Sequence, residues 1–437
     1  MRVASAISLG ALALSCHGGK SQPAPAVDSG GSTSASREAG PSATLPPARF
    51  SRPLAAAHGK SGLTYVAGLV VPSSVIAVTA LAADGTTRWT RDAITGVSWS
   101  ANATLTAIPT PRGGIVVWHG PRAGQDVTVA AHLDESGTVL DEAFTIGAAA
   151  CATDAELAWA ERGTKGTWLV KARAFGLPAQ VTALALPEDR DPVVLCTPHR
   201  IFAFGDGDDD VTLTSWGQGV RAPALRVMED VEFGSDEERG HEVYAVGEVV
   251  GIVRYGGSGG VAAREVSGEK RSAWRRFGKK LAEGDDVLLV DADARTALLA
   301  YTHDVSGLED PAGAASATSV MALGWDRTEV RDWTHELAPA DPLHGRGPFW
   351  SGAVASGLVV GWAERASHDD AGGAPIEGMA YRVVSGETVG ELKRVALAAD
   401  ELVDAGCDDA RCYAVALERK AGEDGGQPEV AEVVAYP

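Results

Sequence analysis

One acidic stretch has the spacing of a cation site. Residues 205–210 read Gly-Asp-Gly-Asp-Asp-Asp, so Asp206, Asp208 and Asp210 alternate in the way that hard oxygen ligands of Ca²⁺ do. A twelve-residue calcium loop also needs Gly at its sixth position and Glu at its twelfth, where this chain has Val211 and Gly217. The stretch therefore predicts either a weak metal site or, as the alternative, a solvated acidic turn between two strands.

A basic stretch is the strongest candidate for a binding surface. Residues 270–280 carry six positive charges and two aromatic rings in a protein of formal net charge −20. The candidate binding residues are Lys270, Arg271, Trp274, Arg275, Arg276, Phe277, Lys279 and Lys280. We expect an outer strand that docks an acidic envelope protein or another anionic envelope component, with one ring exposed, since side chains three apart on a strand face opposite sides. The alternative is an edge strand kept basic to prevent edge-to-edge pairing.

No catalytic signature is present in the sequence. The chain lacks the G-x-S-x-G nucleophile elbow, the phosphate-binding P-loop, the H-E-x-x-H zinc motif and the dinucleotide-binding fingerprint. Its ten histidines are scattered without ligand spacing. We therefore predict no catalytic residue and no cofactor, although an enzymatic activity stays open. The acidic balance argues against nucleic acid as a partner, because phosphates would be repelled.

Four of the five cysteines are candidates for disulfide bonds. Cys407 and Cys412 lie within Cys-Asp-Asp-Ala-Arg-Cys, a spacing that suits a stapled turn in an exported protein. Cys151 and Cys196 are far apart in the sequence. Four cysteines allow three pairings, and we predict only the Cys407–Cys412 bond.

The N-terminus reads as an export signal followed by a tether. Arg2 precedes an apolar run, residues 3–14, which is too short to span a bilayer and ends close to Cys16. This region resembles a bacterial lipoprotein signal, although Ala13 stands where such signals usually have Leu. The resemblance implies that residues 1–16 are a signal, that Cys16 is lipidated, and that the protein is exported and anchored to the outer membrane through lipid alone. Residues 17–48 are rich in Ser, Pro, Gly and Ala and predict a disordered tether.

A phrase repeated every 50 residues or so predicts the fold. Trp-Ala-Glu-Arg occurs at Trp159 and again at Trp362, and both copies belong to a series of eight short apolar phrases. The phrases begin at Leu63, Gly114, Glu156, Arg200, Val249, Thr296, Gly357 and Arg411. Each is followed by alternating strands and polar turns, which makes about four strands per unit and leaves no long amphipathic helix.

Repeated four-stranded units of this length are typical of a β-propeller. We predict an all-β propeller over residues 49–437, with eight blades counted and seven as the alternative. The repeated tryptophans are expected to fill the space between neighbouring blades, with the Glu and Arg that follow them in surface ion pairs. The spare strand at residues 49–55 is expected to complete the last blade and close the ring.

One unit adds a resemblance at the level of fold. Asp84, Gly85 and Trp89 resemble the repeat of quinoprotein-like propellers, although that repeat places two residues between the Asp and the Gly. Some lipid-anchored propellers of this kind are non-enzymatic scaffolds for outer-membrane assembly, so the resemblance implies a binding or scaffolding role. The alternative is a hydrolase or lyase of envelope or extracellular polymers, with its site at the mouth of the channel.

Overall fold

The computed structural model of the 437-residue chain contains strands and turns in the part that it describes. The described residues are 43–44, 51–59, 62–70, 73–82, 86–163, 168–175, 181–186, 192–206, 210–217, 220–221, 225–229, 238–256, 260–278, 281–282, 285–304, 318–329, 331–341, 345–367, 374–407, 412–419 and 429–436. Within these ranges, no helix has the length and apolarity needed to cross a membrane.

The described strands form eight antiparallel sheets, which we number in chain order. The first three sheets contain β2 (Ser51–His58), β3 (Thr64–Val70), β4 (Val75–Leu81) and β5 (Thr87–Thr95); β6 (Thr104–Thr110), β7 (Gly113–Arg122), β8 (Gln125–Asp134) and β9 (Val139–Thr145); and β10 (Ala148–Ala152), β11 (Glu156–Arg162), β12 (Trp168–Ala174) and β13 (Val181–Leu186). The fourth and fifth sheets contain β14 (Val193–Cys196), β15 (Ile201–Asp206), β16 (Asp210–Gly217), β17 (Val220–Arg221) and β18 (Leu225–Glu229); and β19 (Glu238–Val246), β20 (Val249–Gly256), β21 (Gly260–Ser267), β22 (Lys270–Arg271) and β23 (Arg275–Arg276). The last three sheets contain β24 (Val287–Ala292), β25 (Thr296–Asp304), β26 (Thr318–Asp326) and β27 (Asp332–Ala338); β28 (Gly345–Val354), β29 (Gly357–Arg365), β30 (Ile376–Ser385), β31 (Thr388–Val389) and β32 (Lys393–Ala399); and β33 (Glu401–Cys407), β34 (Cys412–Arg419), β35 (Glu429–Tyr436) and β1 (Ala43–Thr44).

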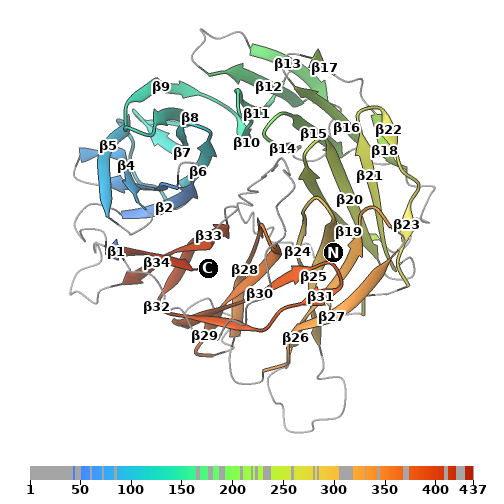
Figure 1. Cartoon of the computed structure of the whole chain (residues 1–437). Coiled ribbons are helices and arrows are strands. Elements are labelled where there is room, and N and C mark those ends of the chain that lie inside the picture. The colour runs from blue at the N-terminus through green and yellow to red at the C-terminus, as the bar shows by residue number, and fades with distance from the viewer. Residues whose placement is uncertain are drawn as a thin grey trace, which may run out of the picture.

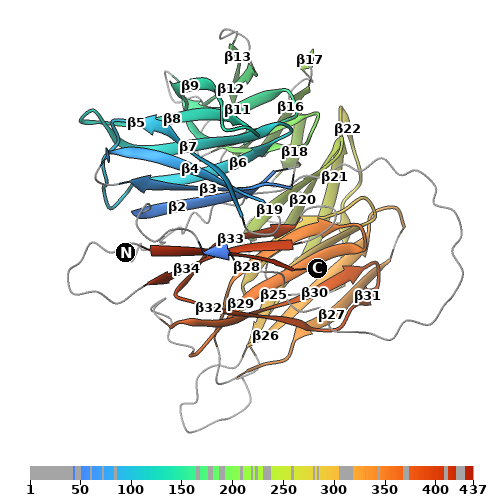
Figure 2. The ribbon, with the colours of Figure 1, turned by 60° about the vertical axis from the view of Figure 1, so that its left-hand side comes forward.

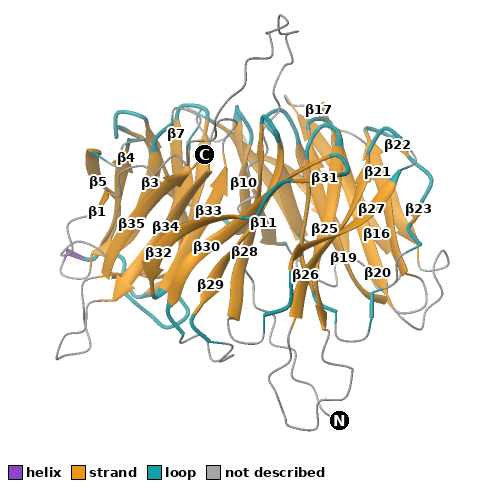
Figure 3. Cartoon of the chain, turned by 60° about the horizontal axis from the view of Figure 1, so that its bottom comes forward, coloured by secondary structure: helices purple, strands orange, loops and turns teal. Residues whose placement is uncertain are grey.

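The sheets follow one another around a ring, as Figure 1 shows. The first strand of each sheet contacts the first strand of the next, and β33 of the eighth sheet contacts β2 of the first. Figure 2 shows the same ring obliquely, and in Figure 3 the strands cross between its two faces with turns at both. The fold is therefore an all-β propeller, as the sequence predicts.

The repeated phrases have one structural position. Each of the eight forms the second strand of a different sheet, from β3 in the first to β34 in the eighth. These strands are rich in β-branched and aromatic residues and are buried on both faces, since a sheet covers them on each side. The 50-residue period of the sequence is thus the period of the sheets.

The core lies between neighbouring sheets, and the repeated tryptophans are part of it. Trp362 is fully buried between the sixth and seventh sheets, and Trp159 is buried between the second and third. Their role as fillers between sheets is confirmed. The glutamates that follow form partly exposed ion pairs, as predicted, Glu161 with Lys171 and Glu364 with Arg394. Arg365 differs from the prediction, because its guanidinium donates to the carbonyls of Gly347 and Ala374.

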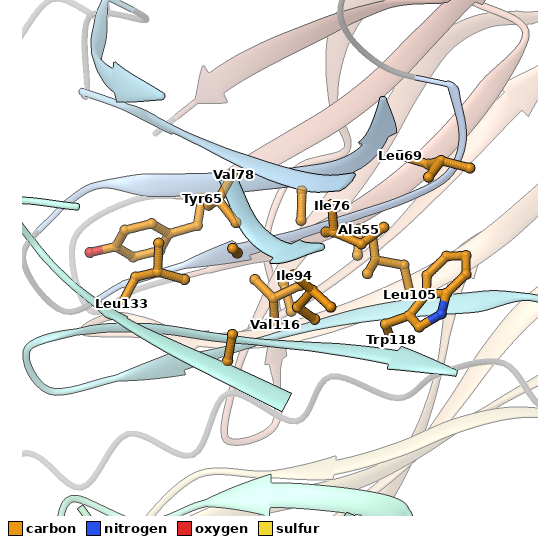
Figure 4. Close-up of a cluster of buried hydrophobic side chains, with 14 of the residues drawn as sticks. Ala55, Tyr65, Leu69, Ile76, Val78, Ile94, Leu105, Val116, Trp118 and Leu133 are labelled. Atoms are coloured by element: carbon orange, nitrogen blue, oxygen red, sulfur yellow. The ribbon is translucent and has the colours of Figure 1, made fainter. Parts of the chain in front are cut away.

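The first and second sheets share the largest apolar cluster among the described residues, shown in Figure 4. Tyr65 and Ile76 from the first sheet meet Val116 and Trp118 from the second, and all four are buried. Burying a side chain of this kind stabilises the folded state by roughly 1.5 to 3 kcal/mol relative to exposure. Adjacent sheets are therefore held together mainly by apolar contact.

Two glycines give large rings room within a sheet. Gly361 lies opposite Trp350 in the β28–β29 pair, and an added Cβ would stand 2.1 Å from that indole. Gly251 lies opposite Tyr244 in the β19–β20 pair, where the corresponding distance to the phenol ring is 2.0 Å. The rings fold over bare backbone, which is a close approach that only glycine permits.

The strand that completes the eighth sheet differs from the predicted one. Residues 49–55 fall largely in β2, the first strand of the first sheet, where Ala55 and Ala57 are buried close to the ring's centre. Small side chains suit this crowded position. The last sheet is completed instead by β1, whose Ala43 and Thr44 pair with Val433 and Glu432 of β35. A segment from the N-terminal region and the last strand thus share one sheet.

Candidate functional site

The basic stretch forms the outer edge of the fifth sheet, as two short strands rather than the single strand expected. Lys270 and Arg271 of β22 pair with Ser267 and Val266 of β21, and β23 pairs further along the same strand. The interruption has a local cause at Ser272. Its hydroxyl accepts a hydrogen bond from the amide of Glu265, and its own amide donates to the Glu265 carbonyl.

Part of the stretch serves the fold instead of a partner. The guanidinium of half-buried Arg275 donates to the carbonyls of Asp326, Glu329 and Arg331, which belong to the turn between β26 and β27 of the next sheet. Three backbone acceptors from a neighbouring turn make this side chain a clamp between the fifth and sixth sheets. Arg275 is therefore removed from the predicted binding set.

The two aromatic rings also pack inward. Phe277 is 5% exposed and lies against Trp325 of the sixth sheet, with ring centroids 4.9 Å apart. Trp274 is half-buried, and the Arg264 guanidinium lies 4.5 Å from its ring centroid. The expectation of one exposed ring is wrong for the described structure, because the interrupted strand turns both rings toward apolar or cationic neighbours.

Three cations of the set are exposed. Lys270, Arg271 and Arg276 lie along an edge whose partners on β21 run from Ala262 to Ser267. At about 3.3 Å per residue this edge is roughly 17 Å long. We call these three residues the basic edge. Lys279 and Lys280 lie outside the described residues.

Both pairs of cysteines in the described part are bonded. Cys407 and Cys412 are joined across the turn between β33 and β34, with 3.9 Å between their Cα atoms. Cys151 of β10 is bonded to Cys196 of β14, a pairing that the sequence left open. The second bond links the first strands of the third and fourth sheets, so it staples neighbouring sheets near the ring's centre. Cys16 lies outside the described residues.

The acidic stretch lies between two strands, as its alternative interpretation expects. Asp206 ends β15 and Asp210 begins β16, and these strands pair with each other. Asp208 lies outside the described residues. Nowhere in the described ranges do three His, Cys, Asp or Glu side chains come close enough to hold a metal ion.

The first strands carry two acids that the sequence analysis missed. Burial raises the pKa of Asp291 on β24 to about 6, against the opposing effect of hydrogen bonds from the Ala292 amide and the Ser351 hydroxyl. Burial raises the pKa of Asp404 on β33 to about 7, against hydrogen bonds from the Tyr413 hydroxyl and a backbone amide. Both aspartates are half-buried in their first strands.

These two acids lie in different junctions between sheets. The Asp291 carboxyl forms a hydrogen bond with the Ser351 side chain of β28, between the sixth and seventh sheets. Asp404 accepts from Tyr413 at 3.3 Å, and the Tyr413 ring stacks on His58 of the first sheet with centroids 4.9 Å apart. Because the pKa of each carboxyl lies close to neutral pH, each is able to donate or accept a proton. The two carboxyls have different hydrogen-bond partners and do not form one pair.

One signal in the sequence marks these acids. The phrase Leu-Val-Asp-Ala occurs twice, at residues 289–292 and 402–405, each time placing an Asp within an otherwise apolar first strand. Glu242 on β19 is a third acid on a first strand, and burial raises its pKa while nearby His241 opposes the rise. An acid in the innermost strand of a repeat, where its neighbours are Val, Leu and Ala, is the pattern to look for.

Comparison with known proteins finds similar solved structures but no family. No family model and no curated protein matches the chain. The WD40 domain of SCAP from fission yeast is similar at 8% identity, covering 88% of this chain and 94% of that one, with a TM-score of 0.44. The propeller domain of the trilobed protease from Pyrococcus furiosus is similar at 11% identity over 64% and 82% of the two chains, with a TM-score of 0.37. An ulvan lyase is similar at 11% identity over 80% and 96%, with a TM-score of 0.41.

Proposed function

We propose that this protein is a non-enzymatic binding or scaffolding propeller of the cell envelope, which docks an anionic partner through the basic edge. The observation that carries the proposal is the exposure of Lys270, Arg271 and Arg276 together on one sheet edge of a strongly acidic protein. A local field opposite in sign to that of the whole molecule steers an anionic partner to one place. An acidic envelope protein and another anionic envelope component share this chemistry.

The attachment to the envelope is part of the same proposal and rests on the sequence. Lipid on Cys16 and a tether between Cys16 and β1, shorter than the predicted residues 17–48 because Ala43 and Thr44 belong to the eighth sheet, would hold the ring close to the outer membrane while leaving it free to reach partners.

The test is capture of envelope partners by a variant that lacks the basic edge. Lys270, Arg271 and Arg276 are changed together to Gln, and partners are recovered from the native envelope. The control changes three exposed arginines elsewhere, Arg88, Arg91 and Arg112, to Gln, so both variants lose the same charge. We expect capture to fail only for the first variant and to weaken for the native protein as salt rises, because exposed charges act over about 10 Å at 0.1 M salt. Equal capture by the two variants contradicts the proposal.

The two aspartates Asp291 and Asp404 support one other candidate function, that of a hydrolase or lyase of envelope or extracellular polymers. A carboxyl that is still partly protonated at neutral pH has the state that a general acid needs, and Asp291 and Asp404 both meet this condition. The candidate predicts that the native protein cleaves isolated envelope polymers and that Asp291→Asn or Asp404→Asn abolishes the cleavage. Release of new polymer ends is the measurement, and its absence from the native protein excludes this candidate.

A further inference from the structure

Three connections meet at one rim of the first and second sheets and hold each other in place. The segment after β5, residues 96–103, is central, and we call it the Trp99 loop. Its Val97 amide donates to the Ser74 carbonyl at 3.1 Å, and its Ser98 amide donates to the Pro121 carbonyl at 3.0 Å. In the opposite direction, the Ala123 amide of the turn between β7 and β8 donates to the Gly96 carbonyl of the loop at 3.0 Å.

Side chains reinforce this backbone network. Val97 is 1% exposed and belongs to the core shared by the first two sheets, so the loop is anchored two residues before Trp99. The Arg122 guanidinium donates to the Thr95 carbonyl at 3.0 Å. After Trp99 the chain turns back at once, with the Ala103 amide donating to the Ser100 carbonyl. The position of Trp99 is therefore fixed from both sides.

Backbone strain is concentrated at the same place. In the described part of the chain, Ser74 and Ala123 are the two residues other than glycine with positive φ, at 53° and 51°. Both lie in the turns that bond to the Trp99 loop. Such conformations are unfavourable and persist where the surroundings impose them, often at binding sites.

Trp99 itself is left open to solvent. Its exposed fraction is 61%, the highest of the large apolar side chains in the described ranges. The others that are exposed, Val139, Leu140 and Val193, lie on β9 and β14 and not in this loop. The residues around Trp99 in the loop are small or polar and uncharged, among them Ser98, Ser100 and Asn102. A rigid platform thus presents one exposed aromatic ring, and its neighbours along the loop carry hydroxyl and amide groups.

We propose that the Trp99 loop binds a neutral saccharide. A pyranose ring has a face of C–H groups, which suits the electron-rich face of an indole, and a rim of hydroxyls, which suits uncharged hydrogen-bonding side chains. A protein partner would require a wider apolar centre around its anchor residue, whereas Trp99 has no second large apolar side chain beside it in the loop. The surface is independent of the basic edge, which lies across the ring in the fifth sheet (Figure 1).

The test uses the full chain labelled with 5-fluorotryptophan. Trp99→Phe identifies the fluorine resonance of Trp99 by its loss. The protein is then titrated with cellohexaose and hexa-N-acetylchitohexaose, both neutral, and with a heparin hexasaccharide as the anionic comparison. We expect a neutral sugar to shift the Trp99 resonance. We also expect magnetisation to transfer from the protein to the C–H protons of the sugar. Trp99→Ala should weaken this binding about tenfold or more, because stacking on an aromatic ring is worth about 1.4 kcal/mol.

Leu140→Ala is the matched control, since Leu140 is 48% exposed on β9 and lies outside the loop. It should leave saccharide binding unchanged, and the melting temperature of both alanine variants should stay close to that of the native protein. A Trp99 resonance that responds to neither neutral sugar, or that responds only to the heparin fragment, overturns the proposal. Equal binding by Trp99→Ala and the native protein overturns it as well.

Discussion

Replacing Arg275 with Met tests whether the basic stretch is divided between fold and binding, as the structure indicates. Methionine keeps much of the length of the side chain and removes the guanidinium that donates to the carbonyls of Asp326, Glu329 and Arg331. The turn between β26 and β27 then loses three charge-assisted hydrogen bonds from the fifth sheet. The contact of the guanidinium with the Phe277 ring, 5.3 Å from its centroid, is lost too.

The magnitude follows from the number and burial of these bonds. A hydrogen bond with a charged partner contributes about 1.5 kcal/mol at the low end, so three would contribute roughly 4.5 kcal/mol if fully buried. Arg275 is only half-buried, and water can replace part of what is removed. We therefore expect Arg275→Met to lower the free energy of unfolding by about 2 to 3 kcal/mol.

The assay is urea unfolding followed by far-ultraviolet circular dichroism, with Arg276→Met as the matched control. Arg276 is the neighbour of Arg275 on the same two-residue strand, but it is exposed. Its replacement should change the free energy of unfolding by less than about 1 kcal/mol, as for other exposed charges. Equal losses for the two variants would refute the division of this stretch into a clamp and a binding edge.

Three other changes have definite expected outcomes. Replacing both Cys151 and Cys196 with Ala should lower the free energy of unfolding by about 4 kcal/mol, as expected from a bond that closes a 45-residue separation, whereas the short Cys407–Cys412 loop should account for about 2 kcal/mol. Thermal unfolding with and without reductant measures both effects, and equal losses would contradict the loop-length argument. Asp404→Asn should flatten the dependence of stability on pH between about 4 and 7. In the native protein this carboxyl has a pKa of about 7, so it holds a proton that the unfolded chain has lost in this pH range. The native protein therefore loses stability as pH rises from about 4 to 7, and the variant should not. Urea unfolding at several pH values decides this, and an unchanged pH profile would show that Asp404 is not the group responsible. Cys16→Ser should release the protein from membranes, because it removes the predicted lipid attachment, and an unchanged fractionation pattern would rule out the anchor.

The fold could be predicted from the sequence because each unit repeats the same local pattern of short apolar strands and polar turns. The strands at Trp159 and Trp362 are recognisable within a few residues, and their spacing gives the unit of repetition. Contacts between units were not accessible. The clamp of Arg275 on a turn more than 50 residues away, and the pairing of β1 with β35, join segments that no local pattern connects.

The candidate site was predictable in part for the same reason. Charge density alone marked residues 270–280, but which of the cations are exposed depends on the neighbouring sheet. The inward packing of Phe277 against Trp325 likewise follows from the next unit and not from the alternation of its own strand. Asp291 and Asp404 became candidates only when the first strands were seen to line the centre of the ring, since burial there shifts their pKa values.

The central claim, that the basic edge is the docking surface, is tested most directly by crosslinking in cells. A photoreactive amino acid is placed at position 270 on the basic edge or at position 88 on the outer strand of the first sheet, and the cells are irradiated with the envelope intact. The account predicts a discrete crosslinked product from position 270 that disappears when Arg271 and Arg276 are changed to Gln, and none from position 88. A product of equal yield from both positions, or a product from position 270 that persists without Arg271 and Arg276, would contradict it.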